Sequence, residues 1–199
     1  MSALLIAGSP SERSRSAALL DAVAQRLSVR GALVDRVHIR NLSPQALLLA
    51  DFAHPTVVNA LDQVARARVL VVASPVYKAA YSGVLKVFLD LLPQTALKGK
   101  VVLPLATGGS PHHMLALDYA LRPVLQSLGA KSILPGIYAT DAQVALTPEG
   151  AYHLQDDIAK RLDEAVHVLF TETLRPTPAQ VAHSAHFAPV HFSQVRCSV

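Results

Sequence analysis

The sequence predicts one three-layer α/β domain, in which helices cover both faces of a parallel sheet. Five short apolar runs rich in Leu, Ile and Val alternate along the chain with segments of helical spacing. The 199 residues are 51% hydrophobic and 16% charged, which suffices for one buried core and excludes wholesale disorder. Parallel strands joined through helices need right-handed crossovers, so the expected fold class is a doubly wound, five-stranded parallel sheet.

The expected strands are continuous apolar runs, as is typical of strands buried on both faces. They cover residues 3–7, 32–39, 69–74, 101–106 and 132–139. The expected helices carry apolar residues at helical spacing. They cover residues 16–29, 56–68, 83–92, 114–128 and about 154–174. We expect the domain to span residues 1–175, because residues 176–199 follow no period and resemble a tail or an arm toward a neighbouring subunit.

Two prolines conflict with these assignments. Pro104 lies inside the fourth strand, although proline is normally confined to a strand edge, end or bulge. Pro123 lies inside the fourth helix, where it removes the N–H that would bond the Tyr119 carbonyl. We therefore expect a kink or a π-bulge near Tyr119.

Composition argues against several classes of partner. The net charge of +4 comes from scattered Lys and Arg, without the basic run that follows a nucleic-acid backbone. Cys197 is the single cysteine, so we expect neither an internal disulfide nor a metal site. No apolar run approaches the roughly 20 residues that span a bilayer, and residues 3–7 are too short for a signal sequence. We expect a cytoplasmic protein without membrane or nucleic-acid partners.

The turn after the first strand is the first candidate site. It reads Gly-Ser-Pro-Ser-Glu-Arg-Ser-Arg-Ser over residues 8–16 and opens directly into a helix. Free N–H groups and the positive end of the helix dipole favour an anion there. The turn is neither a dinucleotide fingerprint nor a P-loop, which points to the terminal phosphate of a mononucleotide. The alternative is a helix simply capped by Ser14, with solvated arginines.

The turns after the third and fourth strands are the other candidates, because ligands of open α/β sheets bind beyond the carboxyl ends of the strands. Residues 75–83 form a proline-initiated turn with two tyrosines, and residues 107–113 read Thr-Gly-Gly-Ser-Pro-His-His. Adjacent glycines let the backbone approach a flat ligand closely. Together the three turns would grip a phosphate and a planar ring, unless they are ordinary turns whose tyrosines cover the core.

Four longer runs carry a family resemblance. They are P-V-Y-K-A-A-Y-S-G-V-L-K at 75–86, L-L-P at 91–93, G-K-V-V-L-P-L-A-T-G-G at 99–109 and D-Y-A-L-R-P-V-L at 118–125. The chain resembles, over about residues 3–144, the NADPH-dependent FMN reductases of alkanesulfonate assimilation. The resemblance implies a flavodoxin-like fold, FMN as substrate or loosely held cofactor, NADPH as hydride donor and a homodimer or homotetramer. It also implies a partner, a flavin-dependent alkanesulfonate monooxygenase that uses reduced FMN to release sulfite.

The same resemblance implies site residues. On the phosphate loop these are Ser9, Ser14, Arg15 and Ser16. Where the family commonly has Gly-Ser-Pro-Arg, this chain has Ser11 in place of the arginine, so Arg13 is the candidate substitute. Beside the flavin ring the implied residues are Pro75, Val76, Tyr77 and Ser82 on one side and Thr107, Gly108, Gly109, Ser110 and His113 on the other.

Tyr119 matches the family's tyrosine in a π-helical insertion at a subunit contact. This expectation agrees with the backbone break inferred from Pro123. The alternative is a buried helix tyrosine next to an ordinary proline kink.

The implied reaction needs no catalytic side chain, because the two cofactors carry the hydride chemistry. The protein must stack the two rings and stabilise charge near flavin N1 and O2, a role we assign to the backbone of residues 107–110. One rival is a quinone or azo reductase with tightly held FMN, since the same fold serves both chemistries. Another is a flavodoxin-type electron carrier, which the positive net charge disfavours.

Overall fold

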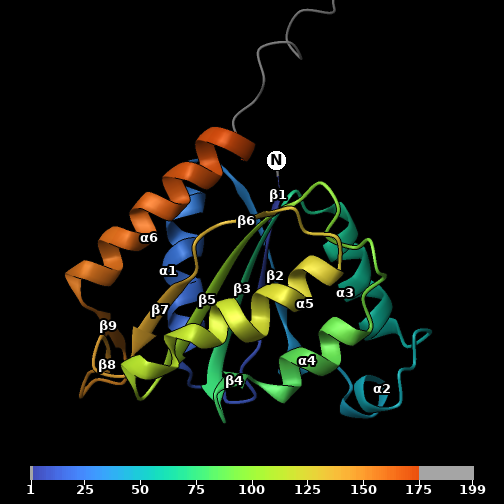
Figure 1. The fold of residues 1–199 in the computed structure, drawn as a ribbon, viewed down its shortest axis with the longest axis horizontal. Helices are drawn as coiled ribbons and strands as arrows, with labels where there is room; N and C mark the ends of the chain where they lie inside the picture. Colours follow the sequence, from blue (N-terminus) through green and yellow to red (C-terminus); the bar gives the residue numbers. More distant parts are fainter. Residues whose placement is uncertain (1, 175–199) are drawn as a thin grey trace, which may run out of the picture.

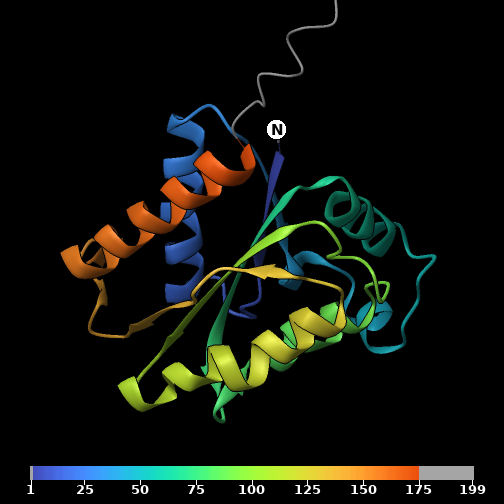
Figure 2. The same cartoon turned by 45° about the horizontal axis from the view of Figure 1, so that its top comes forward.

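The protein is a parallel sheet between two layers of helices (Figures 1 and 2). The computed structural model describes residues 2–174, so the expected tail over 176–199 lies outside the described residues. The sheet has the order β2-β1-β3-β5-β6, with β7 also pairing with β5. Its parallel strands are β1 (Ser2–Ala7), β2 (Leu33–His38), β3 (Val69–Tyr77), β5 (Val101–Gly108), β6 (Ser132–Ile133) and β7 (Ile137–Thr140). This is the flavodoxin-like arrangement that the sequence predicts.

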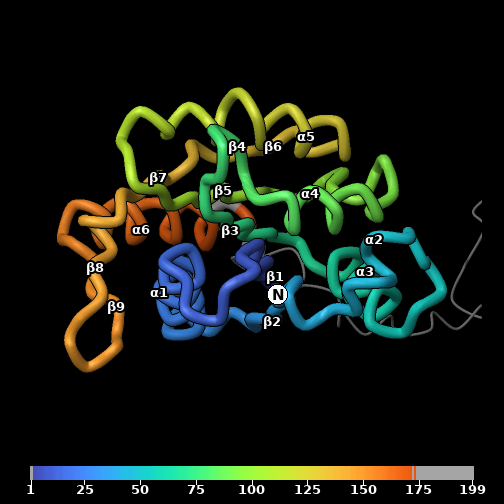
Figure 3. Tube along the Cα trace, turned by 90° about the horizontal axis from the view of Figure 1, so that it is seen from below, coloured from blue at the N-terminus to red at the C-terminus, as the bar shows by residue number. Residues whose placement is uncertain are grey.

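Each face of the sheet has its own core. On one face, α1 (Arg15–Val29) and α6 (Asp156–Leu169) pack against alternate strand residues such as Leu5 and Val71. On the other face, α3 (Pro55–Arg66), α4 (Gly83–Asp90) and α5 (Arg122–Ser127) pack against the intervening residues, such as Leu4 and Val72. Figure 3, seen from below, looks onto the turns at the carboxyl ends of the strands. The doubly covered sheet explains why its strands read as continuous apolar runs.

Several short elements were not predicted. They are a 3₁₀ turn (Ile39–Asn41), α2 (Pro44–Leu48), β4 (Ala80–Tyr81), a 3₁₀ helix (Pro111–Leu115), β8 (Val144–Leu146) and β9 (Tyr152–Leu154). β4 folds back antiparallel onto the end of β3 through Lys78 and Ala79, both at positive φ. β8 and β9 form a separate antiparallel hairpin before α6. All are two to five residues long, too short to show a period.

The single strand expected over residues 132–139 is wrong in one respect, because it is divided into β6 and β7. This division also accommodates Pro104 inside central β5. β5 pairs with β6 up to Val102 and pairs with β7 again only from Leu105. The Val102 carbonyl accepts a hydrogen bond from Leu134 N at 2.9 Å, so residue 104, two further along, also turns its main chain toward this side. The missing N–H of Pro104 therefore falls where the neighbouring strand is interrupted.

The backbone break expected near Tyr119 is confirmed. A π-helix spans Leu117–Leu121, and α5 begins directly after it at Arg122. Pro123 consequently lies in the first turn of α5, where a missing N–H is tolerated. Tyr119 is 79% exposed, so the alternative of a buried helix tyrosine is wrong. A second π-helix, Phe170–Leu174, follows α6.

Candidate functional site

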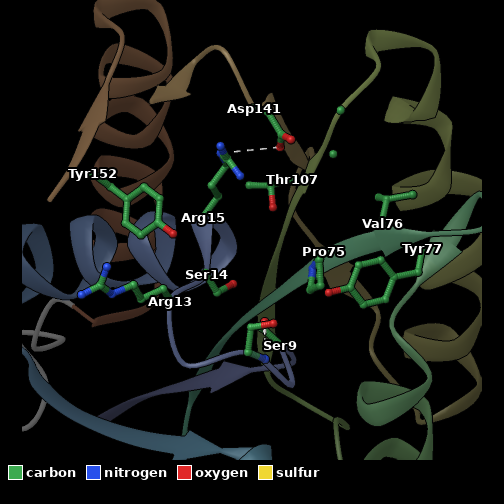
Figure 4. Close-up of a pocket in the computed structure, with 13 residues that line it drawn as sticks. Ser9, Arg13, Ser14, Arg15, Pro75, Val76, Tyr77, Thr107, Asp141 and Tyr152 are labelled. Carbon is green, nitrogen blue, oxygen red and sulfur yellow. Dashed lines mark hydrogen bonds and ion pairs between the residues drawn. The ribbon is translucent and has the colours of Figure 1, made fainter. Parts of the chain in front are cut away.

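A pocket of about 340 Å³ lies at the carboxyl edge of the sheet (Figure 4). The three turns that the sequence singles out converge on it, together with the turn after β7 and strand β9. Its volume is in the range of small-molecule sites. The lining residues are Ser9, Ser11, Arg13, Ser14, Arg15, Pro75, Val76, Tyr77, Thr107, Gly108, Gly109, Asp141 and Tyr152.

The anion loop, residues 8–16, forms one end of the pocket. Ser14 caps α1, and its Oγ accepts a hydrogen bond from Ala17 N at 3.4 Å and lies 2.9 Å from Ser16 Oγ. Ser9 Oγ accepts from Ser11 N at 3.2 Å. The first turn of α1 holds no acidic residue, so the positive end of its dipole faces the pocket uncompensated. Ser14 therefore both caps the helix and lines the pocket.

The two arginines of the anion loop differ in their partners. Arg15 Nε donates to the Val144 carbonyl at 3.0 Å and lies 3.7 Å from Asp141 Oδ1. Arg13 lines the same pocket, and within residues 2–174 its guanidinium has no hydrogen bond or ion pair. Arg15 is therefore engaged by the protein, whereas none of the described residues engages the Arg13 guanidinium.

The other end of the pocket is built from backbone. A Cβ atom at position 108 would lie 2.5 Å from Tyr138 Oη, whereas one at position 109 would meet only Asp141 Oδ2, at 3.8 Å. The Tyr138 hydroxyl is held there because it donates to the Ser110 carbonyl at 2.6 Å. Burial raises the pKa of the Tyr138 phenol, and the Asp141 carboxylate adds to the rise. Gly108 is thus fixed by packing, and Gly109 leaves its side of the turn open.

Ser82 and Ser16 are buried and do not line the pocket. Ser82 caps α4 by accepting from Leu85 N at 3.1 Å, and its Oγ donates to the Gly8 carbonyl. Its own N–H donates to Ser74 Oγ at 2.9 Å. Ser82 therefore joins the anion loop to the turn after β3 and positions both.

Ser110 and His113 also lie outside the pocket lining. Ser110 caps a 3₁₀ helix by accepting from His112 N at 3.3 Å. His113 borders a separate surface hollow of about 490 Å³, together with Ala79, Leu115 and Tyr119. Met114, Leu115 and Tyr119 are all more than half exposed, so this neighbouring surface is apolar.

Asp141 and Tyr152 line the pocket, but the sequence analysis did not identify either as a site residue. Asp141 follows β7, and its N–H donates to the Gly108 carbonyl at 3.1 Å. The carboxyl end of the fifth strand opens at the same edge as the others, so a polar residue there was a usable signal. Tyr152 lies on β9, in the hairpin that the sequence did not predict, and so had no such signal.

The described residues form neither a metal site nor a membrane-spanning helix. Residues 2–174 hold no group of three His, Cys, Asp or Glu side chains arranged to bind a metal ion. Within the same residues, no helix has the length and apolar character needed to cross a membrane.

The fold defines a flavodoxin-like protein with a pocket at the carboxyl edge of its sheet. The family model for NADPH-dependent FMN reductase matches residues 1–145, and the chain belongs to this family. Membership confirms the enzyme class and the two cofactors, FMN and NADPH, that the resemblance implies.

Similar proteins agree with this assignment. An FMN reductase (NADPH) of Escherichia coli (strain K12) is 44% identical over 185 residues, covering 91% of this chain and 94% of the relative. An FMN reductase (NADPH) of Pseudomonas putida (strain KT2440) is 49% identical over 162 residues, covering 81% of both chains. A solved structure of an NADH:FMN oxidoreductase, EMOB in its apo form, matches with a TM-score of 0.80 at 40% identity, over 89% of this chain and 92% of that one.

Proposed function

We propose that this enzyme reduces FMN in the pocket at the carboxyl edge and passes reduced FMN to a partner flavin-dependent alkanesulfonate monooxygenase, in the cytoplasm. The convergence of the anion loop and the Gly108–Gly109 backbone on one pocket carries the first part of the proposal. The runs at 75–86 and 99–109, which resemble the reductases of alkanesulfonate assimilation, support the second.

The residues present fit FMN. Hydroxyl groups of Ser9 and Ser14, the amino end of α1 and Arg13, whose guanidinium has no partner within residues 2–174, supply donors for a phosphate. Pro75–Tyr77 and Thr107–Gly109 flank the space left for a flat ring. When bound, FMN supplies the hydride-accepting chemistry, so the work of this chain is to orient the ring and to leave its outer face accessible.

The apolar surface around the π-helix is the proposed subunit contact. Met114, Leu115 and Tyr119 are exposed, and Leu115 and Tyr119 line the hollow that His113 borders. Exposed apolar patches of this kind mark protein contacts. We infer a homodimer or homotetramer in which Tyr119 packs against a second copy of the chain.

An anaerobic reduction assay tests the activity. Protein, FMN and NADPH are mixed without oxygen, and the loss of flavin colour is followed, with NADH, FAD and riboflavin as comparisons. We expect catalytic bleaching of FMN by NADPH. An electron carrier would leave the colour unchanged, and a quinone or azo reductase would keep FMN bound through gel filtration; either result would contradict the proposal.

A coupled assay tests the partner. Purified flavin-dependent alkanesulfonate monooxygenase is supplied with oxygen, an alkanesulfonate, FMN and NADPH, with and without this enzyme. We expect sulfite release only when the enzyme is present. If FMN is reduced without any increase in sulfite, the proposed monooxygenase partner would be wrong, while the reductase activity would still be supported.

A further inference from the structure

Asp141 places a negative charge between the two ends of the pocket, beside Arg15 of the anion loop and the Gly109 backbone. Its Oδ1 lies 3.7 Å from Arg15 Nε, and the pair is drawn as a dashed line in Figure 4. Both side chains line the pocket and remain partly accessible, at 49% for Asp141 and 36% for Arg15. An entering phosphate therefore meets this carboxylate together with the cations of the anion loop.

Arg15 has a second anchor besides Asp141. Its Nε donates to the Val144 carbonyl at 3.0 Å, which is shorter than its 3.7 Å separation from the carboxylate. The Asp141 main chain is likewise held without its side chain, because its N–H donates to the Gly108 carbonyl at 3.1 Å. Both residues thus have an anchor besides their ion pair, and the carboxylate adds negative charge next to a loop arginine.

We propose that Asp141 is a specificity-determining residue that weakens the binding of the flavin phosphate. Its carboxylate competes with the phosphate for Arg15 and repels it directly, since like charges in one partly desolvated site oppose each other. A reductase that passes on its flavin gains from such a residue, because reduced FMN leaves more readily. The inference rests on the proposed function, in which the phosphate binds at the anion loop.

The test compares FMN with riboflavin, which has the same ring and no phosphate. Asp141→Asn keeps the shape of the side chain and removes its charge. Titration of flavin fluorescence, without NADPH, should show FMN binding about three- to tenfold tighter and riboflavin binding unchanged. The gain should shrink at high salt, because Asp141 is accessible to solvent. Equal tightening of both flavins, or no tightening of FMN, would overturn the proposal.

Asp163→Asn is the matched control. Asp163 is also half exposed, at 54%, and pairs with an arginine of α1, Arg26, at 2.6 Å. It does not line the pocket, so its loss of charge should change FMN affinity by less than about twofold. If Asp163→Asn gained as much FMN affinity as Asp141→Asn, the effect would be due to net charge, and the proposal would also be overturned.

Arg13→Ala separates this inference from the proposed function. With phosphate at the anion loop, Arg13→Ala should weaken FMN about tenfold relative to riboflavin. If the ratio of FMN affinity to riboflavin affinity did not change, the phosphate would bind elsewhere, and both proposals would lose their basis. If Arg13→Ala lowers this affinity ratio but Asp141→Asn does not bind FMN more tightly, only the role of Asp141 would be overturned.

Discussion

The two ends of the pocket are built in different ways. The anion loop presents side chains, namely hydroxyls and arginines, at the start of a helix. The opposite end presents backbone, with Gly108 pressed against the Tyr138 hydroxyl and Gly109 facing open space. Substitutions in the anion loop should therefore change the affinity for FMN in graded steps. In the glycine turn, position 108 should tolerate almost no added side-chain volume.

Gly108→Ala should have the largest effect. The new Cβ would lie 2.5 Å from a hydroxyl that is itself anchored on Ser110, so either the turn must shift or the Tyr138 hydroxyl must leave the Ser110 carbonyl. We expect a loss of about 1–3 kcal/mol in unfolding free energy, measured by urea denaturation, and weaker binding of FMN and riboflavin alike.

Two companion variants sharpen that prediction. Tyr138→Phe in the Gly108→Ala background leaves the ring carbon as the nearest Tyr138 atom, at 3.5 Å, and should restore most of the stability. Gly109→Ala should leave stability nearly unchanged, while a bulky residue at Gly109 should weaken flavin reduction. Equal destabilisation by Ala at 108 and 109 would contradict the distinction between the two glycines.

Ser82→Ala should disturb the anion loop and the turn after β3 together. The variant leaves the Gly8 carbonyl and Leu85 N without their buried partner, which costs about 1–3 kcal/mol of unfolding free energy. FMN and riboflavin should lose affinity by the same factor, because Ser82 does not touch the ligand space. A selective loss of FMN affinity would instead place Ser82 at the phosphate.

Ser14→Ala should give a smaller and selective change. It removes the α1 cap, at a cost of about 1 kcal/mol, and one candidate phosphate donor. Ser43→Ala is the control, since Ser43 caps α2 by accepting from Ala46 N at 3.3 Å and lies outside the pocket lining. Both variants should lose stability, and only Ser14→Ala should weaken FMN relative to riboflavin. If Ser14→Ala weakened FMN and riboflavin binding equally, Ser14 would act only as the helix cap and not as a phosphate donor.

The pH dependence of stability should show the smallest effect. Burial and Asp141 raise the pKa of Tyr138 above 10.0, so the neutral phenol is favoured in the folded state. The resulting contribution of Tyr138 to the unfolding free energy is complete below its ordinary pKa and is lost as the pH rises through its raised pKa. Unfolding free energy should therefore fall less steeply above about pH 10 in Tyr138→Phe than in the parent protein. Identical slopes would contradict this assignment.

The sequence predicted the sheet well, because strands buried on both faces leave long apolar runs that need no tertiary information. It could not predict the β8–β9 hairpin, whose three-residue strands show no period, and so Tyr152 was missed. Sequence reasoning also could not separate neighbouring turn residues by their exposure to the pocket. Ser14 and Ser16 share a turn, but only the three-dimensional structure shows that Ser14 lines the pocket and that Ser16 is buried behind it.

A crystal structure with bound FMN would test the central claim most directly. We predict the phosphate within about 3.2 Å of the Ser9 or Ser14 hydroxyl and the Arg13 guanidinium. The ring should then lie between residues 75–77 and the Gly108–Gly109 backbone. A phosphate outside residues 8–16, or a flavin seated in the hollow beside His113, would contradict the account.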